Sequence, residues 1–336
     1  MAIFKKLNIG DVVATSGTKA FRKLTTEEPI GNYIKFSSPS AFTLSTANAK
    51  KNWDGVLEYS TDENIWNAWD GTSTLSADSG VMYIRGTGNT IITGDMSVYR
   101  EKSWVLVGSN IACDGNIENL LDYATVANGK HPRMASGCYH SIFCACTSLT
   151  TAPVLPATSL ASKCYFQMFY GCTNLTKAPT LPATTLAYQC YLNMFIDCTS
   201  LTTAPVLPAT TLADYCYYRM FKGCTNLTKA PTLPATTLAD YCYYGMFRDC
   251  TNLTTLPTLP ATSLADYCYF DMFRGCESIK LSDTNTGEYK TPYRIPTSGT
   301  GTAATTSLSN MFFGTGGTFK SVPSINTTYY TSNAVV

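Results

Sequence analysis

The residues of this 336-residue chain that could do chemistry are mainly cysteines, aspartates and tyrosines, and most of them recur at one spacing. The C-x7-C pairs differ from the C-x2-C pairs of zinc sites. Such regular thiols are expected to be reduced and buried as small hydrophobes, with disulfides within or between repeats as the alternative. The cysteines form two ladders with a period of 26 residues: Cys138, Cys164, Cys190, Cys216, Cys242 and Cys268, and Cys146, Cys172, Cys198, Cys224, Cys250 and Cys276.

Acid–base and metal chemistry have few other candidates. His131 and His140 are the two histidines of the chain, too few for a multi-histidine metal site and a poor basis for a Ser-His-Asp triad. Asp214, Asp240 and Asp266 stand at one position in three repeats and could bind calcium or serve as paired carboxylates, but the [ST]-x-x-[DE] pattern at each favours helix capping. The sequence therefore predicts no enzyme activity, no catalytic residue, no metal site and no cofactor.

Aromatic side chains give the strongest signal for binding. Tyrosine follows every first-ladder cysteine, and more aromatic residues recur on either side of that pair. These columns cannot all be buried, and an exposed tyrosine column suits contact with protein or glycan. Stacking between repeats that only stiffens the structure is the alternative. Together with slots that vary between repeats, the candidate contact surface consists of Gln167, Asn193, Arg219, Asp271, Tyr215, Tyr218, Tyr241, Tyr244 and Tyr267.

The composition of the chain argues against nucleic acid and membrane as partners. The chain has 24 basic and 23 acidic residues, so its net charge of +1 provides no field to attract nucleic acid. No window is apolar enough to predict a membrane span. The segment that begins MAIFKK has no long apolar run after its lysines, and we expect no export signal there.

Each repeat combines a helix-like pattern with an extended segment. In Leu238–Pro260, apolar residues stand at Leu238, Ala239, Cys242, Tyr243, Met246, Phe247 and Cys250, which predicts an amphipathic helix. The next segment, Leu-x-x-Ala-Pro-x-Leu-Pro, predicts a shallow parallel ribbon interrupted by proline. A slot that favours a left-handed residue at the helix end holds Gly171, Asp197, Gly223, Asp249 and Gly275. The period and these elements together predict an α/β solenoid.

The pattern divides the chain into five regions. Residues 1–28 form an N-terminal anchoring arm and 29–113 an all-β domain. A short helix in 114–133 caps the solenoid, six repeats occupy 134–280, and 281–336 hold a degenerate repeat and a C-terminal cap. The chain is thus expected to be multidomain.

The all-β domain is predicted from short strand-like runs separated by turn signals, which are typical of a sandwich or barrel. Trp53, Trp66, Trp69 and Trp104 all lie in this domain, and core packing is favoured over a sugar-binding platform. The runs are Tyr33–Phe36, Phe42–Leu44, Val56–Tyr59, Ile65–Trp69, Val81–Ile84, Met96–Tyr99 and Trp104–Val107.

The string Met-Phe-x-Gly-Cys-Thr-Asn-Leu-Thr-x-Ala-Pro at Met168–Pro179 and Met220–Pro231 resembles the A-F-x-x-C-x-x-L-x-x-V-x-I-P unit of BspA-type leucine-rich repeats. Phe169, Cys172 and Leu175 match by position, and the resemblance recurs from about Cys138 to Ile279. This chain departs from the unit in its 26-residue period, in the methionine before phenylalanine and in an extra proline. The resemblance implies a leucine-rich-repeat solenoid used in adhesion.

The overall organisation resembles structural proteins of phages that infect Bacteroides-like gut bacteria. This resemblance implies a non-enzymatic virion protein, a fibre, decoration or host-adhesion component, assembled in the host cytoplasm. Other virion proteins would contact the arm and the β-domain, a host surface protein or glycan would contact the repeats, and we expect a homo-oligomer. The alternatives are a BspA-like bacterial cell-surface adhesin and a polysaccharide-active enzyme.

Overall fold

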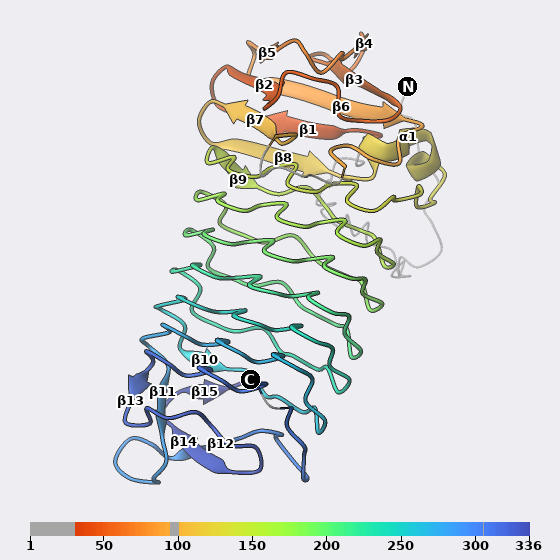
Figure 1. Ribbon diagram of the computed structural model, residues 1–336. Coiled ribbons are helices and arrows are strands. Elements are labelled where there is room, and N and C mark those ends of the chain that lie inside the picture. The colour runs from red at the N-terminus through yellow and green to blue at the C-terminus, as the bar shows by residue number, and fades with distance from the viewer. Residues whose placement is uncertain (1–30, 95–100, 305) are drawn as a thin grey trace, which may run out of the picture. The chain divides into compact units, whose positions relative to one another are not determined.

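A computed structural model describes residues 31–94, 101–304 and 306–336 of the chain. The predicted arm at 1–28 and the predicted strand Met96–Tyr99 lie outside these residues. Gly31–Val336 forms one compact unit that consists mostly of strands and turns (Figure 1). Among the described residues there is one helix, α1 (Asn119–Ala127), which lies within the region predicted to be helical.

Two open sheets form the β-domain, and neither closes into a barrel. The first has the strand order β4-β3-β6-β1-β8-β9 and the second the order β5-β2-β7. Pairs are antiparallel except β8 with β9. The strands are β1 (Ile34–Ser37), β2 (Phe42–Thr46), β3 (Val56–Ser60), β4 (Asn67–Ala68), β5 (Leu75–Ala77), β6 (Val81–Thr87), β7 (Trp104–Val107), β8 (Ile111–Gly115) and β9 (Leu149–Thr151).

Tryptophan packing holds the core of the β-domain. Trp53, Trp69 and Trp104 are buried, with ring centroids 4.9 Å apart between the first two and 5.5 Å between the last two. Trp66 is partly exposed, but the guanidinium of Arg85 covers its ring at 3.9 Å. The prediction of core packing is therefore confirmed for three of the four rings.

The β-domain continues directly into the repeats. The N–H groups of Ile92, Trp104 and Ile111 each donate at 2.8 Å to carbonyl groups of the first repeat. Strand β9 of that repeat extends the first sheet through its parallel pairing with β8. The end of the stack is thus covered by β-strands of the preceding domain, whereas α1 packs against β6.

The helix predicted in each repeat is wrong, because these segments are chains of tight turns. In the second repeat, the N–H groups of Phe166, Met168 and Tyr170 donate to the carbonyl three residues earlier. The residues between them donate instead to the next repeat, as Gln167 does to Leu192 at 2.9 Å and Phe169 to Met194 at 3.0 Å. We call each 26-residue copy a turn of the stack; Figure 1 shows these turns lying one above another.

A four-residue backbone rhythm explains the misreading. Every fourth residue is left-handed, for example Lys163 (φ 55°), Gln167 (φ 53°) and Gly171 (φ 71°). Pairs of residues therefore point alternately inward and outward, which places apolar residues at successive spacings of one and three, as in Cys164, Tyr165, Met168 and Phe169. Over nine residues this pattern is nearly indistinguishable from the 3.6-residue period of a helix.

The extended part of each turn forms fewer strand pairs with its neighbours than the predicted parallel ribbon would have. Its parallel contacts are mostly single bridges, such as Lys177 with Thr203 and Thr185 with Thr211. Prolines remove backbone donors from the ladder there. Leu175, Leu181 and their counterparts in other turns nevertheless point inward and are buried.

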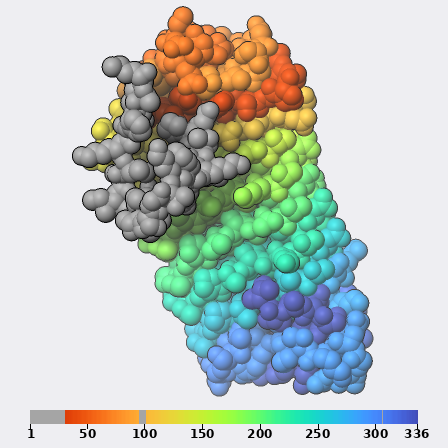
Figure 2. Space-filling model, turned by 180° about the vertical axis from the view of Figure 1, so that it is seen from behind, coloured from red at the N-terminus to blue at the C-terminus, as the bar shows by residue number. Residues whose placement is uncertain are grey.

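Residues at the C-terminal end add a further turn and a small sheet. The N–H of Phe273 donates to Met311 and that of Gly275 to Phe313, both at 2.9 Å, so 306–314 forms a seventh turn. Tyr293 packs edge-on against Phe312 of that turn. Figure 2 shows the last residues (violet) against the blue and cyan turns, consistent with the β10–β15 pair. The strands are β10 (Thr255–Leu256), β11 (Lys280–Ser282), β12 (Thr291–Arg294), β13 (Gly316–Gly317), β14 (Thr328–Thr331) and β15 (Ala334–Val335), with the sheet order β12-β14-β11-β13.

Candidate functional site

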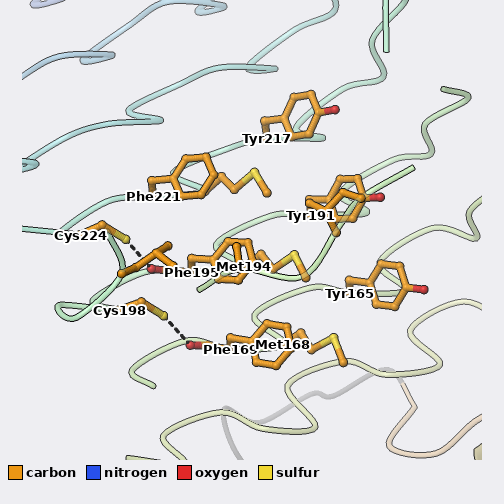
Figure 3. Packing of buried hydrophobic residues seen from close by; sticks show 14 of the residues in the cluster. Tyr165, Met168, Phe169, Tyr191, Met194, Phe195, Cys198, Tyr217, Phe221 and Cys224 are labelled. Atoms are coloured by element: carbon orange, nitrogen blue, oxygen red, sulfur yellow. Dashed lines mark hydrogen bonds between the residues drawn. The ribbon is translucent and has the colours of Figure 1, made fainter. Parts of the chain in front are cut away.

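The interior of the stack is made of columns of identical side chains (Figure 3). The tyrosines that follow the first-ladder cysteines, such as Tyr191 and Tyr217, are buried with their rings stacked 5.8 Å apart. Phe195 and Phe221 form a second stacked column at 5.6 Å. These columns are core, and they are not available for binding.

All fourteen cysteines are buried free thiols. In the second ladder, every thiol from Cys172 onward donates to a phenylalanine carbonyl of the preceding turn, as Cys198 does to Phe169 at 3.1 Å and Cys224 to Phe195 at 3.0 Å (Figure 3). Burial raises the pKa of the Cys190 and Cys268 thiols to about 12. The ladders therefore serve packing and hydrogen bonding between turns.

Asp214, Asp240 and Asp266 are exposed and do not cap helices, because the repeats contain none. Asp214 Oδ1 accepts a hydrogen bond from the Asp240 N–H at 3.1 Å, and Asp240 Oδ1 accepts one from the Asp266 N–H at 3.0 Å. The three carboxylates thus form a vertical row, which we call the acidic row.

Two partly exposed aromatic columns lie beside the acidic row on turns four to six. One consists of Tyr215, Tyr241 and Tyr267, stacked at 4.5 and 4.6 Å. The other consists of Tyr218, Tyr244 and Phe270, stacked at 4.7 and 4.9 Å. We call the six rings the aromatic face. Since their faces contact one another, no space remains between rings for a sugar, and their edges and hydroxyl groups are what a partner would meet.

A basic row borders the aromatic face on its other side. The guanidinium of Arg219 lies 5.0 Å from the Tyr218 ring and 5.3 Å from the Tyr244 ring. Lys222, Arg248 and Arg274 recur at one position, six residues after the first-ladder cysteine, and complete the row with Arg219. This position also varies between repeats, with Tyr170 and Ile196 in earlier turns, and its variation in the sequence marks it as a candidate beside the other variable slots.

The structure divides the predicted contact residues into two groups. All five tyrosines and Arg219 reach the surface. Gln167 and Asp271 are buried, so the prediction that they are contact residues is wrong. Asp271 accepts from Arg248 at 3.0 Å and Arg274 at 3.5 Å, so its carboxylate holds the basic row rather than facing a partner. Asn193 is partly exposed, but its Oδ1 is buried without a hydrogen bond.

A separate pocket of about 410 Å³ is lined by Glu118, just before α1, by His131 and Met134 in the loop after α1, and by Ser159 and its neighbours in the stack. The His131 ring nitrogen lies 2.8 Å from the buried Glu118 carboxylate. Burial raises the pKa of Glu118, and His131 opposes this shift. The pair ties the loop after α1 to the helix start, and sequence reasoning missed it because thirteen residues separate the partners.

Comparisons with known proteins give no neighbour. No family model, no curated protein and no solved structure matches the chain. In the described part of the chain, no group of three or more His, Cys, Asp or Glu residues is placed to hold a metal ion. None of its helices has the length and apolarity needed to span a membrane.

Proposed function

We propose that this chain is a non-enzymatic structural protein of a phage virion, a fibre, decoration or host-adhesion component, and that its repeats form a BspA-type leucine-rich-repeat solenoid. The arm and the β-domain attach to other virion proteins, and the repeats present a surface for binding. The alternative, a bacterial cell-surface adhesin, would use the same surface on a cell.

One observation carries this proposal: the repeats hold a fixed interior and vary on one outward face. The buried positions keep cysteine, tyrosine, methionine and phenylalanine from turn to turn. Charge and aromatic character are concentrated outside, in the acidic row, the aromatic face and the basic row. Tyrosine and arginine are enriched where proteins bind one another, so the surface favours a protein partner over a glycan.

Particle composition tests the proposal. Virions from a gut phage that encodes this chain would be purified on a density gradient and digested, and their peptides would be identified by mass spectrometry. We expect peptides of this chain in stoichiometric amounts with the other structural proteins. Finding the polypeptide on the host cell surface and absent from particles would support the adhesin and overturn the virion assignment.

A further inference from the structure

We propose that the aromatic face of turns four to six binds a second copy of the same chain, with the two stacks parallel and related by a two-fold axis that runs along them. The inference shares the contact surface of the proposed function and gives that surface a partner. Particle composition tests the virion assignment independently, so failure of one does not decide the other.

The order of rows across the face carries the argument. Asp214 stands two residues before Cys216, Tyr218 two residues after it, and Lys222 six residues after it. Contacts fix the same order in space: the Tyr215 and Tyr218 rings are 5.7 Å apart, and Arg219 lies over Tyr218. The face therefore has a negative side, an aromatic centre and a positive side.

Turns five and six repeat this arrangement. Asp240 and Asp266 continue the negative side. Arg248 and Arg274 continue the basic row, but Asp249 and Asp271 pair with them, so the net positive charge of this side comes from Arg219 and Lys222 of turn four. The corresponding positions in the second and third turns hold Ser162, Tyr188, Tyr170 and Ile196, which carry no charge. The pattern is thus confined to three consecutive turns and defines one patch.

Symmetry selects the orientation of the partner. Rotation about an axis along the stack exchanges the two sides of the face, so each acidic row meets the basic row of the other copy. Rotation about an axis across the stack preserves the sides, so like charges meet. Opposite potentials favour association and like charges oppose it, which makes the parallel dimer the complementary arrangement.

The aromatic column at the centre fits this axis. Tyr218, Tyr244 and Phe270 lie midway in sequence between the acidic row and the basic row, so each would meet its own counterpart. Tyr215, Tyr241 and Tyr267 would face the side of the partner that carries Arg219. Three turns spaced roughly 5 Å apart make a small patch, and small interfaces give weak association.

Sedimentation equilibrium of the full chain at rising concentration tests the association. We expect a reversible dimer that weakens as salt screens the charges. Reversing the acidic side of turn four with Asp214→Lys should weaken dimerisation about tenfold, and so should reversing the basic side of the same turn with Arg219→Glu and Lys222→Glu. Mixing these two variants should restore a heterodimer, because the two substituted sides of turn four then carry opposite charges and meet across the parallel interface, as do the two unsubstituted sides.

The control variant Asn226→Lys, Asn252→Lys adds charge at exposed positions of the same turns outside the rows, and it should dimerise like the natural chain. Thermal melting of every variant shows whether it folds. If the natural chain is a monomer at all concentrations, the proposal is overturned, and the aromatic face would then bind a different protein. Loss of dimer in the control to the same extent overturns it as well.

Cross-linking tests the orientation. Tyr218→Cys and Phe270→Cys chains would be mixed under mild oxidation, and the cross-linked products would be identified by mass spectrometry. A parallel dimer joins residue 218 to 218 and 270 to 270. An antiparallel dimer centred on turn five joins 218 to 270, and a majority of that product overturns the proposed axis. The native thiols are buried and should not compete.

Discussion

Burial determines the chemistry of the cysteines in this protein. Desolvation raises the pKa of the Cys146 thiol to about 12 and that of Cys172 and Cys216 well above their ordinary value of 9.0. Because the thiolate is the reactive form of cysteine, these side chains are expected to resist alkylation and oxidation while the chain is folded. Regularity of spacing was enough to predict their burial.

Stability should therefore fall steeply in alkali. A thiol whose pKa is raised by folding stays protonated in the native state, while the same thiol in the unfolded state loses its proton above pH 9. Its stabilising contribution is complete below that pH and is lost as pH rises toward the folded pKa. Each buried thiol removes about 1.4 kcal/mol of stability per pH unit in this window.

Urea unfolding measured between about pH 7 and pH 11 checks this expectation. We expect a constant midpoint up to about pH 8.5, followed by a sharp decline that coincides with reaction of the thiols with iodoacetamide. The buried tyrosines act in the same direction, since burial also raises the pKa of Tyr191 and Tyr217. A midpoint that stays flat through pH 11 would contradict the burial of the ladders.

At the scale of elements, the turn ribbon depends on a left-handed residue at every fourth position. One such slot alternates between glycine and aspartate along the stack: Gly171, Asp197, Gly223, Asp249 and Gly275. A Cβ atom on Gly223 would collide with the Asp197 carboxylate of the preceding turn, and one on Gly275 with Asp249. The alternation lets each aspartate lie over the glycine of the next turn.

Gly223→Ala should accordingly destabilise the protein for two separable reasons. The left-handed backbone at φ 74° costs alanine about 1–2 kcal/mol, and the collision with Asp197 adds to this. The double variant Asp197→Gly, Gly223→Ala removes the collision and should recover part of the loss. Chemical denaturation of the four chains of this cycle measures both terms. Equal losses in the single and double variants would show that the contact between turns carries no energy.

This element also marks the limit of what the sequence predicts. The inward positions, the left-handed slot and the repeat length follow from the spacing of Cys, Phe and Gly residues. The absence of a helix in each repeat could not be predicted from this spacing. The hydrogen bonds of a helix are replaced there by hydrogen bonds to the next turn, and both kinds of bond use backbone atoms that all residues share. Burial of Asp271 was missed for a related reason, since it depends on Arg248 of the preceding turn.

At the scale of the whole molecule, one hydrophobic core runs from the β-domain to the C-terminal sheet. Trp104 stands at the first junction. Its ring contacts Trp69 in the β-domain and Phe143 in the first turn, and its carbonyl accepts the Cys146 thiol at 3.3 Å. The β-domain therefore serves as the preceding layer of the stack, which the division into separate domains did not anticipate.

Truncating the Trp104 side chain should lower the stability of the β-domain and of the first turn together. Trp104→Ala is expected to cost about 3–5 kcal/mol, since it leaves a large cavity between the β-domain and the first turn. Trp104→Phe is the matched control, because it keeps an aromatic ring and removes a buried indole N–H that has no hydrogen-bond partner. Its loss should be much smaller.

Hydrogen exchange followed by mass spectrometry can separate the two regions of the Trp104→Ala protein. A shared core predicts that peptides from β1 and β8 and peptides from the first two turns lose protection to a similar extent, because opening either side exposes the other. Turns near the C-terminal end should be affected least, since each turn contacts only its neighbours. Exchange confined to the β-domain, with the first turn still protected, would instead mean that the repeats hold their own end closed.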